Sequence, residues 1–166
     1  MIRLYRAPLF TNCERVTLAL AHKRLSGDVE SVWIDYADRS AVQAASGQGL
    51  VPVIDHDGTV VADSLAILRH LEMAVLDPPL FPPGAARRVE LDLFLDWFDR
   101  VWKVEPNAIE AELGAPEPDH GRIAALSERM DARLDGFEAL LHGRDHLLGE
   151  EFSAADCAGG VDRARG

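Results

Sequence analysis

The sequence is poor in cysteine and has no long apolar run, and both shortages exclude classes of protein. Its only two cysteines, Cys13 and Cys157, lie far apart. No export signal is expected at residues 1–10, where arginines flank a very short apolar run. A structural disulfide is therefore not predicted. Because no apolar stretch is long enough to span a bilayer, the sequence predicts a soluble cytoplasmic protein.

Basic residues are also scarce. The chain has 17 lysines and arginines against 28 acidic residues, a net charge of −11 at pH 7. This balance argues against nucleic acid or an anionic membrane as a partner. The six histidines show no metal-ligand spacing, so no metal is expected. With 166 residues and 48% hydrophobic content, the chain can form a core in one domain or in two small ones.

The first part of the chain alternates between strand and helix patterns. These patterns predict strands at 1–5 and 29–35, helices at 11–25, 38–46 and 64–75, and a hairpin at 51–62. Thr11 and Glu14 have the spacing of a capping box, with Thr11 as the N-cap. A parallel βαβ unit followed by an antiparallel hairpin and a helix fits one four-stranded sheet with helices on both faces.

The remainder reads as helical after a proline-rich boundary. Residues 76–84 contain four prolines and predict a linker at 77–84 between a domain at 1–76 and a helical domain at 85–158. Wide apolar faces at helical spacing occur over 85–106 and 122–143. Ser153 and Asp156 have the spacing of a second capping box. Residues 159–166 are rich in glycine and charge, which predicts a frayed tail and suggests a truncated C-terminus.

The stretch Gly49–Ser64, "GLVPVIDHDGTVVADS", contains two unusual features. Pro52 interrupts the first strand of the predicted hairpin, where it has no N–H to donate to a neighbouring strand. Asp63 and Ser64 stand side by side where the last helix of this part begins.

The ordered set of motifs resembles the glutathione S-transferase family. The motifs are the βαβαββα order, Val51-Pro52, Asp63-Ser64 followed by "LAI", and "FSAADC" at residues 152–157. Together they cover the chain to residue 158. The resemblance implies an α/β thioredoxin-like domain (βαβαββα) followed by an all-α helical domain, and glutathione as co-substrate.

The resemblance also implies how glutathione is bound. Pro52 would follow a cis peptide bond, and Val51 would offer its N–H and C=O to the cysteinyl backbone of glutathione. Ser64 and the helix amides would hold the γ-glutamyl carboxylate, and Asp63 would accept the ammonium group. The alternative is purely structural: Pro52 is an edge-strand proline, and Asp63 or Ser64 only caps a helix.

The catalytic position departs from the family pattern. In many classes of the family a serine or cysteine that activates the thiol of glutathione lies five residues before an arginine, and Arg15 places that position at Phe10. Phenylalanine can neither donate a hydrogen bond nor act as a nucleophile. The candidates that remain nearby are Thr11, Asn12 and Cys13.

Two of these candidates also have a structural interpretation, whereas Asn12 could donate an amide N–H to the thiolate. Thr11 is explained by its capping role, and Cys13 by packing as a small buried residue, although an exposed Cys13 in a first helical turn would have a lowered pKa. Tyr5 is assigned to the core. The aromatic residues around Trp97 and Trp102, on the side where the family binds the electrophile, are mostly core as well.

The favoured hypothesis is a homodimeric glutathione transferase that conjugates glutathione to a small electrophile in detoxification. One alternative is a glutathione-binding or protein-interaction module of the same fold that has lost the chemistry. A second alternative is a glutathione-dependent thiol oxidoreductase that uses Cys13.

Overall fold

The computed structural model describes residues 1–8, 10–35 and 37–160, which form two compact units. Among the described residues, unit 1 is 1–82 together with 156–160, and unit 2 is Pro83–Ala155. Residues 156–158 therefore group with unit 1, whereas the sequence placed them in the helical domain. Of the predicted frayed tail, Gly159 is still helical, and residues 161–166 lie outside the described residues.

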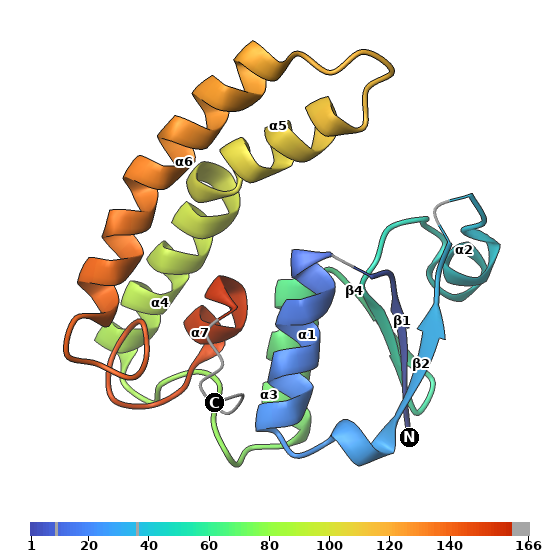
Figure 1. Ribbon diagram of the computed structural model, residues 1–166. Coiled ribbons are helices and arrows are strands. Elements are labelled where there is room, and N and C mark those ends of the chain that lie inside the picture. Colours follow the sequence, from blue (N-terminus) through green and yellow to red (C-terminus); the bar gives the residue numbers. More distant parts are fainter. Residues whose placement is uncertain (9, 36, 161–166) are drawn as a thin grey trace. The chain divides into compact units, whose positions relative to one another are not determined.

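Unit 1 is built on a four-stranded mixed sheet (Figure 1). The strands are β1 (Ile2–Arg6), β2 (Val29–Trp33), β3 (Val53–His56) and β4 (Thr59–Ala62), in the order β2-β1-β3-β4. Only β1 and β2 are parallel. Helices α1 (Thr11–His22) and α3 (Ser64–Ala74) cover one face, and the short α2 (Ser40–Ser46) lies on the other. The predicted thioredoxin-like fold is confirmed.

The core of unit 1 follows from the alternation of side chains along the strands. Ile2 and Leu4 on β1 are buried, while Arg3 between them is exposed. Tyr5 points to the opposite face and packs with Ile34 and Val53, which confirms its assignment to the core.

Helix α1 begins one residue away from the predicted cap. Phe10 is the N-cap, and its C=O accepts the N–H groups of Cys13 and Glu14 at 2.9 and 3.0 Å. Thr11 is therefore the first residue inside the helix, and no side chain caps it. Glu14 instead accepts a hydrogen bond from Arg6 at 2.8 Å. The predicted capping box is wrong because its acid stands one position too far along the helix and pairs with a cation on β1.

A buried ion pair joins the C-terminal ends of α1 and α3. The Lys23 side chain is fully buried, and its ammonium donates to Glu72 at 2.5 Å and to the C=O of Val75 at 2.6 Å. The Glu72 carboxylate also accepts the N–H groups of Leu80 and Phe81, at 2.9 and 3.4 Å. The Glu72 carboxylate thus holds the C-terminal end of α3 against Leu80 and Phe81, near the end of the first segment of unit 1.

Unit 2 contains α4 (Ala85–Trp97), a π-helical turn (Phe98–Trp102), α5 (Val104–Leu113) and α6 (His120–Leu141). The apolar face predicted over 85–106 extends past α4 and the π-helical turn into α5, and Pro106 lies in the first turn of α5. A proline is tolerated there because the first N–H groups of a helix have no partner within it. The last helix, α7 (Ala154–Gly159), follows Ser153, whose hydroxyl accepts the N–H of Ala155 at 3.3 Å.

The aromatic side chains of unit 2 pack against one another, with ring centroids 5.0 to 6.2 Å apart. The cluster consists of Phe94, Trp97, Phe98, Trp102 and Phe137. Its packing confirms the core interpretation of these aromatics. Val89 and Leu93, which the sequence placed on a wide apolar face, are 59% and 67% exposed. No helix within the described ranges combines the length and the apolar character needed to cross a membrane.

Replacement of Lys23 by methionine should destabilise unit 1, because it leaves the Glu72 carboxylate without its buried cation. We expect the free energy of unfolding to fall by about 3 kcal/mol, the lower end for a broken buried pair, since Glu72 keeps two N–H donors. Urea denaturation followed by circular dichroism measures this loss. In the exposed Arg3–Glu30 pair, Arg3→Met should change stability little. Equal losses in the two variants would contradict the role of the buried pair.

Candidate functional site

The start of α3 is held in an unusual backbone conformation. Asp63, the N-cap, has φ 77° and ψ 128°, a region that residues other than glycine seldom adopt. Its Oδ1 accepts the N–H groups of Leu65 and Ala66, both at 3.0 Å. The predicted capping role is confirmed, and it takes up two of the amides that the sequence analysis offered to a ligand. The other oxygen, Oδ2, accepts no hydrogen bond from the residues described, and Asp63 is exposed.

Ser64, the first residue of α3, is 3% exposed and lies against a buried cation. Its Oγ accepts a hydrogen bond from Nη1 of Arg15 at 3.1 Å, and Arg15 is 1% exposed. Within residues 1–8, 10–35 and 37–160, neither the hydroxyl proton nor the N–H of Ser64 has an acceptor. The serine therefore presents two donors at a helix N-terminus, where negative charge is favoured.

Val51 lies at the same end of the hairpin as these residues. Val53 on β3 pairs with Ala62 on β4, so the residues just before β3 and just after β4 are neighbours. The peptide bond between Val51 and Pro52 is cis, as expected from the resemblance. In the part of the chain that the structure describes, no hydrogen bond uses the N–H or the C=O of Val51.

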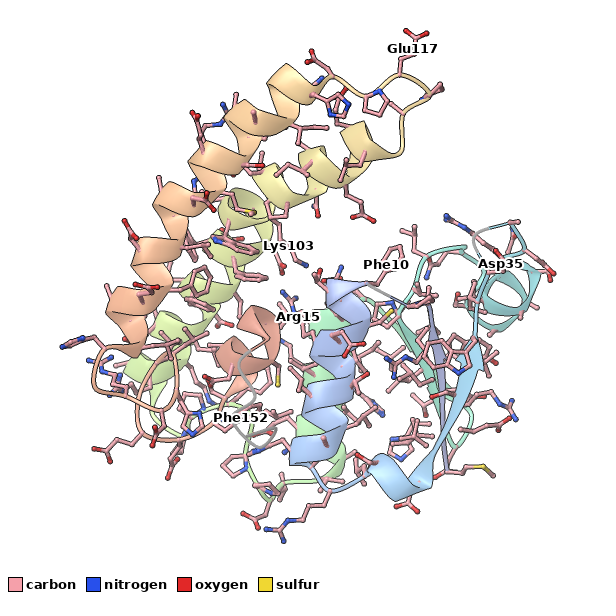
Figure 2. All side chains as sticks on the ribbon, in the orientation of Figure 1. Phe10, Arg15, Asp35, Lys103, Glu117 and Phe152 are labelled. Atoms are coloured by element: carbon pink, nitrogen blue, oxygen red, sulfur yellow. The ribbon has the colours of Figure 1, made fainter. Side chains whose placement is uncertain are left out.

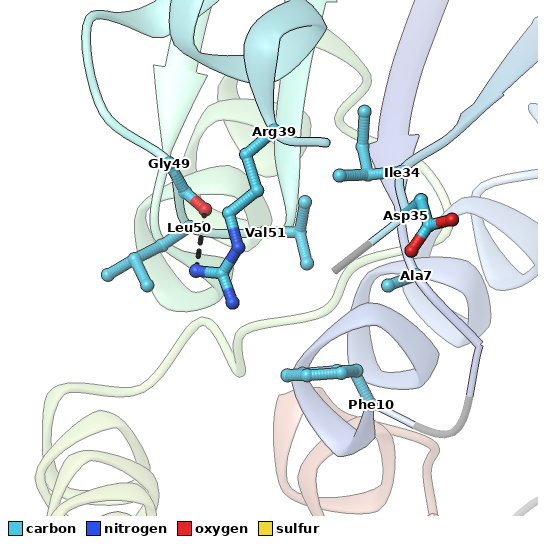
Figure 3. A pocket seen from close by; sticks show the side chains of 8 residues that line it. All are labelled: Ala7, Phe10, Ile34, Asp35, Arg39, Gly49, Leu50 and Val51. Atoms are coloured by element: carbon cyan, nitrogen blue, oxygen red, sulfur yellow. Dashed lines mark hydrogen bonds between the residues drawn. The ribbon is translucent and has the colours of Figure 1, made fainter. Parts of the chain in front are cut away.

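A pocket of about 370 Å³, part of it open to solvent, adjoins Val51 (Figure 3). Its wall is mostly apolar and comes from the segments between β1 and α1, between β2 and α2, and between α2 and β3. The lining residues are Ala7, Phe10, Ile34, Asp35, Arg39, Gly49, Leu50 and Val51.

Two lining side chains carry charge, and sequence reasoning identified neither of them as a site residue. Arg39, the N-cap residue of α2, donates from Nη1 to the C=O of Gly49 at 3.2 Å, which holds its guanidinium beside Val51 (Figure 3). Asp35 follows β2. A guanidinium has five donors and suits a carboxylate, so this part of the pocket fits an anionic group. No sequence signal marks these residues, because the pocket forms only when segments 10 residues or more apart come together.

Comparison with known proteins places the chain in a family. Residues 4–79 match the model of the glutathione S-transferase N-terminal domain. FtsZ-localized protein A of Caulobacter vibrioides is 32% identical, over 93% of this chain and 72% of that protein. A crystal structure of a glutathione S-transferase from Rhodospirillum rubrum F11 is 30% identical with a TM-score of 0.87, over 97% of this chain and 76% of that one. The chain belongs to the glutathione S-transferase family.

Members of this family bind glutathione. A glutathione S-transferase from Methylobacillus flagellatus, whose crystal structure has glutathione bound, superimposes with a TM-score of 0.81 over 97% of this chain and 80% of that one. At 24% identity this likeness shows the fold alone. The chain spans between 41% and 72% of the length of the curated relatives it matches.

In this member of the family, the residue at the expected catalytic position, Phe10, forms part of the pocket wall. Phe10 lies at the start of α1 (Figure 2) and lines the pocket together with Ala7 and Val51 (Figure 3). Thr11 is exposed in the first turn of α1, and its hydroxyl is not used as a cap. The structural explanation for Thr11 is therefore removed, and its hydroxyl stays a candidate beside Phe10.

Cys13 is completely buried. Burial raises the pKa of its thiol, and this effect outweighs a backbone hydrogen bond from Ala7 and the charge of Arg6, which both act to lower it. The condition for a lowered pKa, an exposed thiol in a first helical turn, is not met. The environment fits a small buried side chain rather than a redox centre.

The Cys13 thiol should react slowly in the folded protein, because it is buried and its pKa is raised. In Cys157→Ser, where Cys13 is the only thiol, we expect modification by Ellman's reagent at pH 7 to be roughly tenfold slower or more than in denaturant. Absorbance of the released thiolate measures both rates. A fast reaction of the native protein, with a pH profile that indicates a low pKa, would restore the oxidoreductase hypothesis.

Proposed function

We propose that this chain binds glutathione at the start of α3 and in the pocket beside Val51, and conjugates its thiol to a small electrophile. The proposal rests on two adjacent residues, Asp63 and Ser64, whose polar groups are suited to one ligand. Ser64 offers two donors without acceptors among the described residues, and the neighbouring Asp63 keeps one carboxylate oxygen without a donor.

The γ-glutamyl end of glutathione is a zwitterion, with a carboxylate and an ammonium group on one carbon. Such a group needs donors and an anionic acceptor within a few ångströms of each other. Ser64 supplies the donors at a helix N-terminus, where a carboxylate is stabilised, and Asp63 supplies the acceptor. Helix capping alone explains the hydrogen bonds that Oδ1 of Asp63 accepts. It does not explain why the two donors of buried Ser64 have no acceptor among the described residues.

The remainder of the tripeptide fits the pocket. The unused N–H and C=O of Val51 can pair with the cysteinyl backbone in the manner of a short strand. Glutathione has a second carboxylate on its glycine, and Arg39 places a guanidinium beside Val51. The charged groups at both ends of glutathione thereby find partners of opposite charge or hydrogen-bond donors.

Conjugation requires the thiolate of glutathione near neutral pH, and Phe10 cannot stabilise it. The proposal assigns this role to the Thr11 hydroxyl, together with the amide groups of the first turn of α1. Thr11 is exposed in that turn, next to the Phe10 ring that lines the pocket. A homodimer in the cytoplasm that acts in detoxification is part of the same proposal.

Ser64→Ala should weaken the binding of glutathione about tenfold or more, because a hydrogen bond to a charged group is lost. Isothermal titration calorimetry with glutathione and with S-hexylglutathione measures this loss. We expect the wild type to bind both ligands, the S-alkyl form more tightly. Ser31→Ala, which removes an exposed serine from β2, is the matched control and should bind as the wild type does. The proposal fails if the folded wild type binds neither ligand.

Thr11→Val should raise the pKa of the thiol of bound glutathione by roughly one pH unit, the equivalent of one neutral hydrogen bond. Thiolate absorbance of the complex as a function of pH measures it. Phe10→Ser is the control in the opposite direction. It places a hydroxyl at the family position, so it should lower this pKa and increase the rate of conjugation to 1-chloro-2,4-dinitrobenzene. An unchanged thiol pKa in Thr11→Val would remove Thr11 from the mechanism.

A second candidate function is a protein-interaction module of the same fold. Phe10 at the catalytic position favours it, as does the 32% identity to a protein named for its localisation with FtsZ. It predicts no conjugation by the wild type and direct binding to purified FtsZ, measured by biolayer interferometry. The third candidate, a thiol oxidoreductase using Cys13, finds no support in a fully buried thiol with a raised pKa.

A further inference from the structure

One buried cation, Arg15, contacts a residue of the proposed glutathione site. Arg15 extends from α1 and donates from Nη1 to the hydroxyl oxygen of Ser64 on α3 at 3.1 Å. The two residues are 49 positions apart, and both are at least 97% buried. Figure 2 marks the position of Arg15 on α1.

The chemistry of the two groups determines the orientation of the hydroxyl. A guanidinium has donors and no acceptor, so the serine oxygen must accept and its proton must point elsewhere. A hydroxyl without this contact can rotate among staggered positions and can donate to backbone carbonyls nearby. Arg15 removes the orientation in which the proton faces α1.

We infer that Arg15 is a positioning residue that directs the proton of Ser64 toward the γ-glutamyl carboxylate of glutathione, an inference that rests on the proposed function. Two observations point the same way. The Ser64 proton has no acceptor within the described ranges, although the side chain is buried. The N–H of the same residue is likewise unused, so both donors of Ser64 are left for one anion.

The orientation matters because a hydroxyl held in place before binding loses no rotational freedom when the ligand arrives. The Arg15 charge also lies one hydrogen bond behind the serine, and a buried charge acts on a carboxylate with little screening by solvent. Both effects are directed at the γ-glutamyl carboxylate alone. Neither should change the affinity for a ligand that lacks this carboxylate.

Arg15→Gln is the decisive variant. Its side-chain oxygen can accept from Ser64, so the hydroxyl proton is free to turn toward α1. Calorimetry should compare glutathione with an analogue in which hydrogen replaces the α-carboxylate of the γ-glutamyl group. We expect Arg15→Gln to bind glutathione roughly tenfold more weakly than the wild type does, with the affinity for the analogue unchanged.

Arg15→Lys provides the matched control, because an ammonium group also has donors only and should preserve most of the affinity for glutathione. In a Ser64→Ala background, Arg15→Gln should cause little further loss, since its effect passes through the hydroxyl. Thermal unfolding establishes that each variant is folded. If Arg15→Gln does not fold, Arg15→Met, which also removes the donor to Ser64, completes the same cycle with Ser64→Ala.

Three results would overturn the inference: equal weakening of both ligands in Arg15→Gln, a full additional loss in the Ser64→Ala background, or no loss at all. Each of them would still leave glutathione binding by the wild type intact. If the wild type itself fails to bind glutathione, the proposed function fails first and the inference falls with it.

Discussion

A helix that begins below the surface must find hydrogen-bond partners for the amide groups of its first turn, and this constraint organises unit 1. At α3 the solution has two parts. Asp63 adopts φ 77° and closes over the helix to accept two N–H groups. Ser64 stays buried against Arg15 with its own donors unused among the described residues. The other end of α3 is fixed by Glu72 and Lys23, so the helix presents its N-terminus in a defined position.

The described residues offer more groups suited to binding glutathione than groups suited to activating its thiol. For binding, the described residues offer a donor pair at Ser64, an acceptor at Asp63, a free backbone at Val51 and a cation at Arg39. For chemistry, Phe10 occupies the family's catalytic position and the neighbouring thiol is buried. The proposed recognition of glutathione therefore rests on several independent groups, whereas the proposed activation of its thiol rests on one exposed hydroxyl and a helical turn.

Local patterns predicted most of the fold of unit 1 and the motif at its site. Alternation identified the strands, and the hairpin with an acid-serine pair behind it located the start of α3 correctly. The errors arose where contacts across the chain compete with local ones. Glu14 pairs with Arg6 on β1 instead of capping α1, and this shifts the cap to Phe10. The contact between Arg15 and Ser64 joins residues 49 apart, and no pattern in either segment indicates it.

The central claim is that residues 51 and 64 form one glutathione site, and an NMR titration of the ¹⁵N-labelled protein with glutathione tests it most directly. The account predicts saturable shifts of the Val51 and Ser64 amide signals, both with the same dissociation constant. The signals of residues remote from the site in unit 1, such as Ser31 and Lys23, should stay in place. An unchanged spectrum, or shifts confined to residues outside this hairpin end and its pocket, would contradict the account.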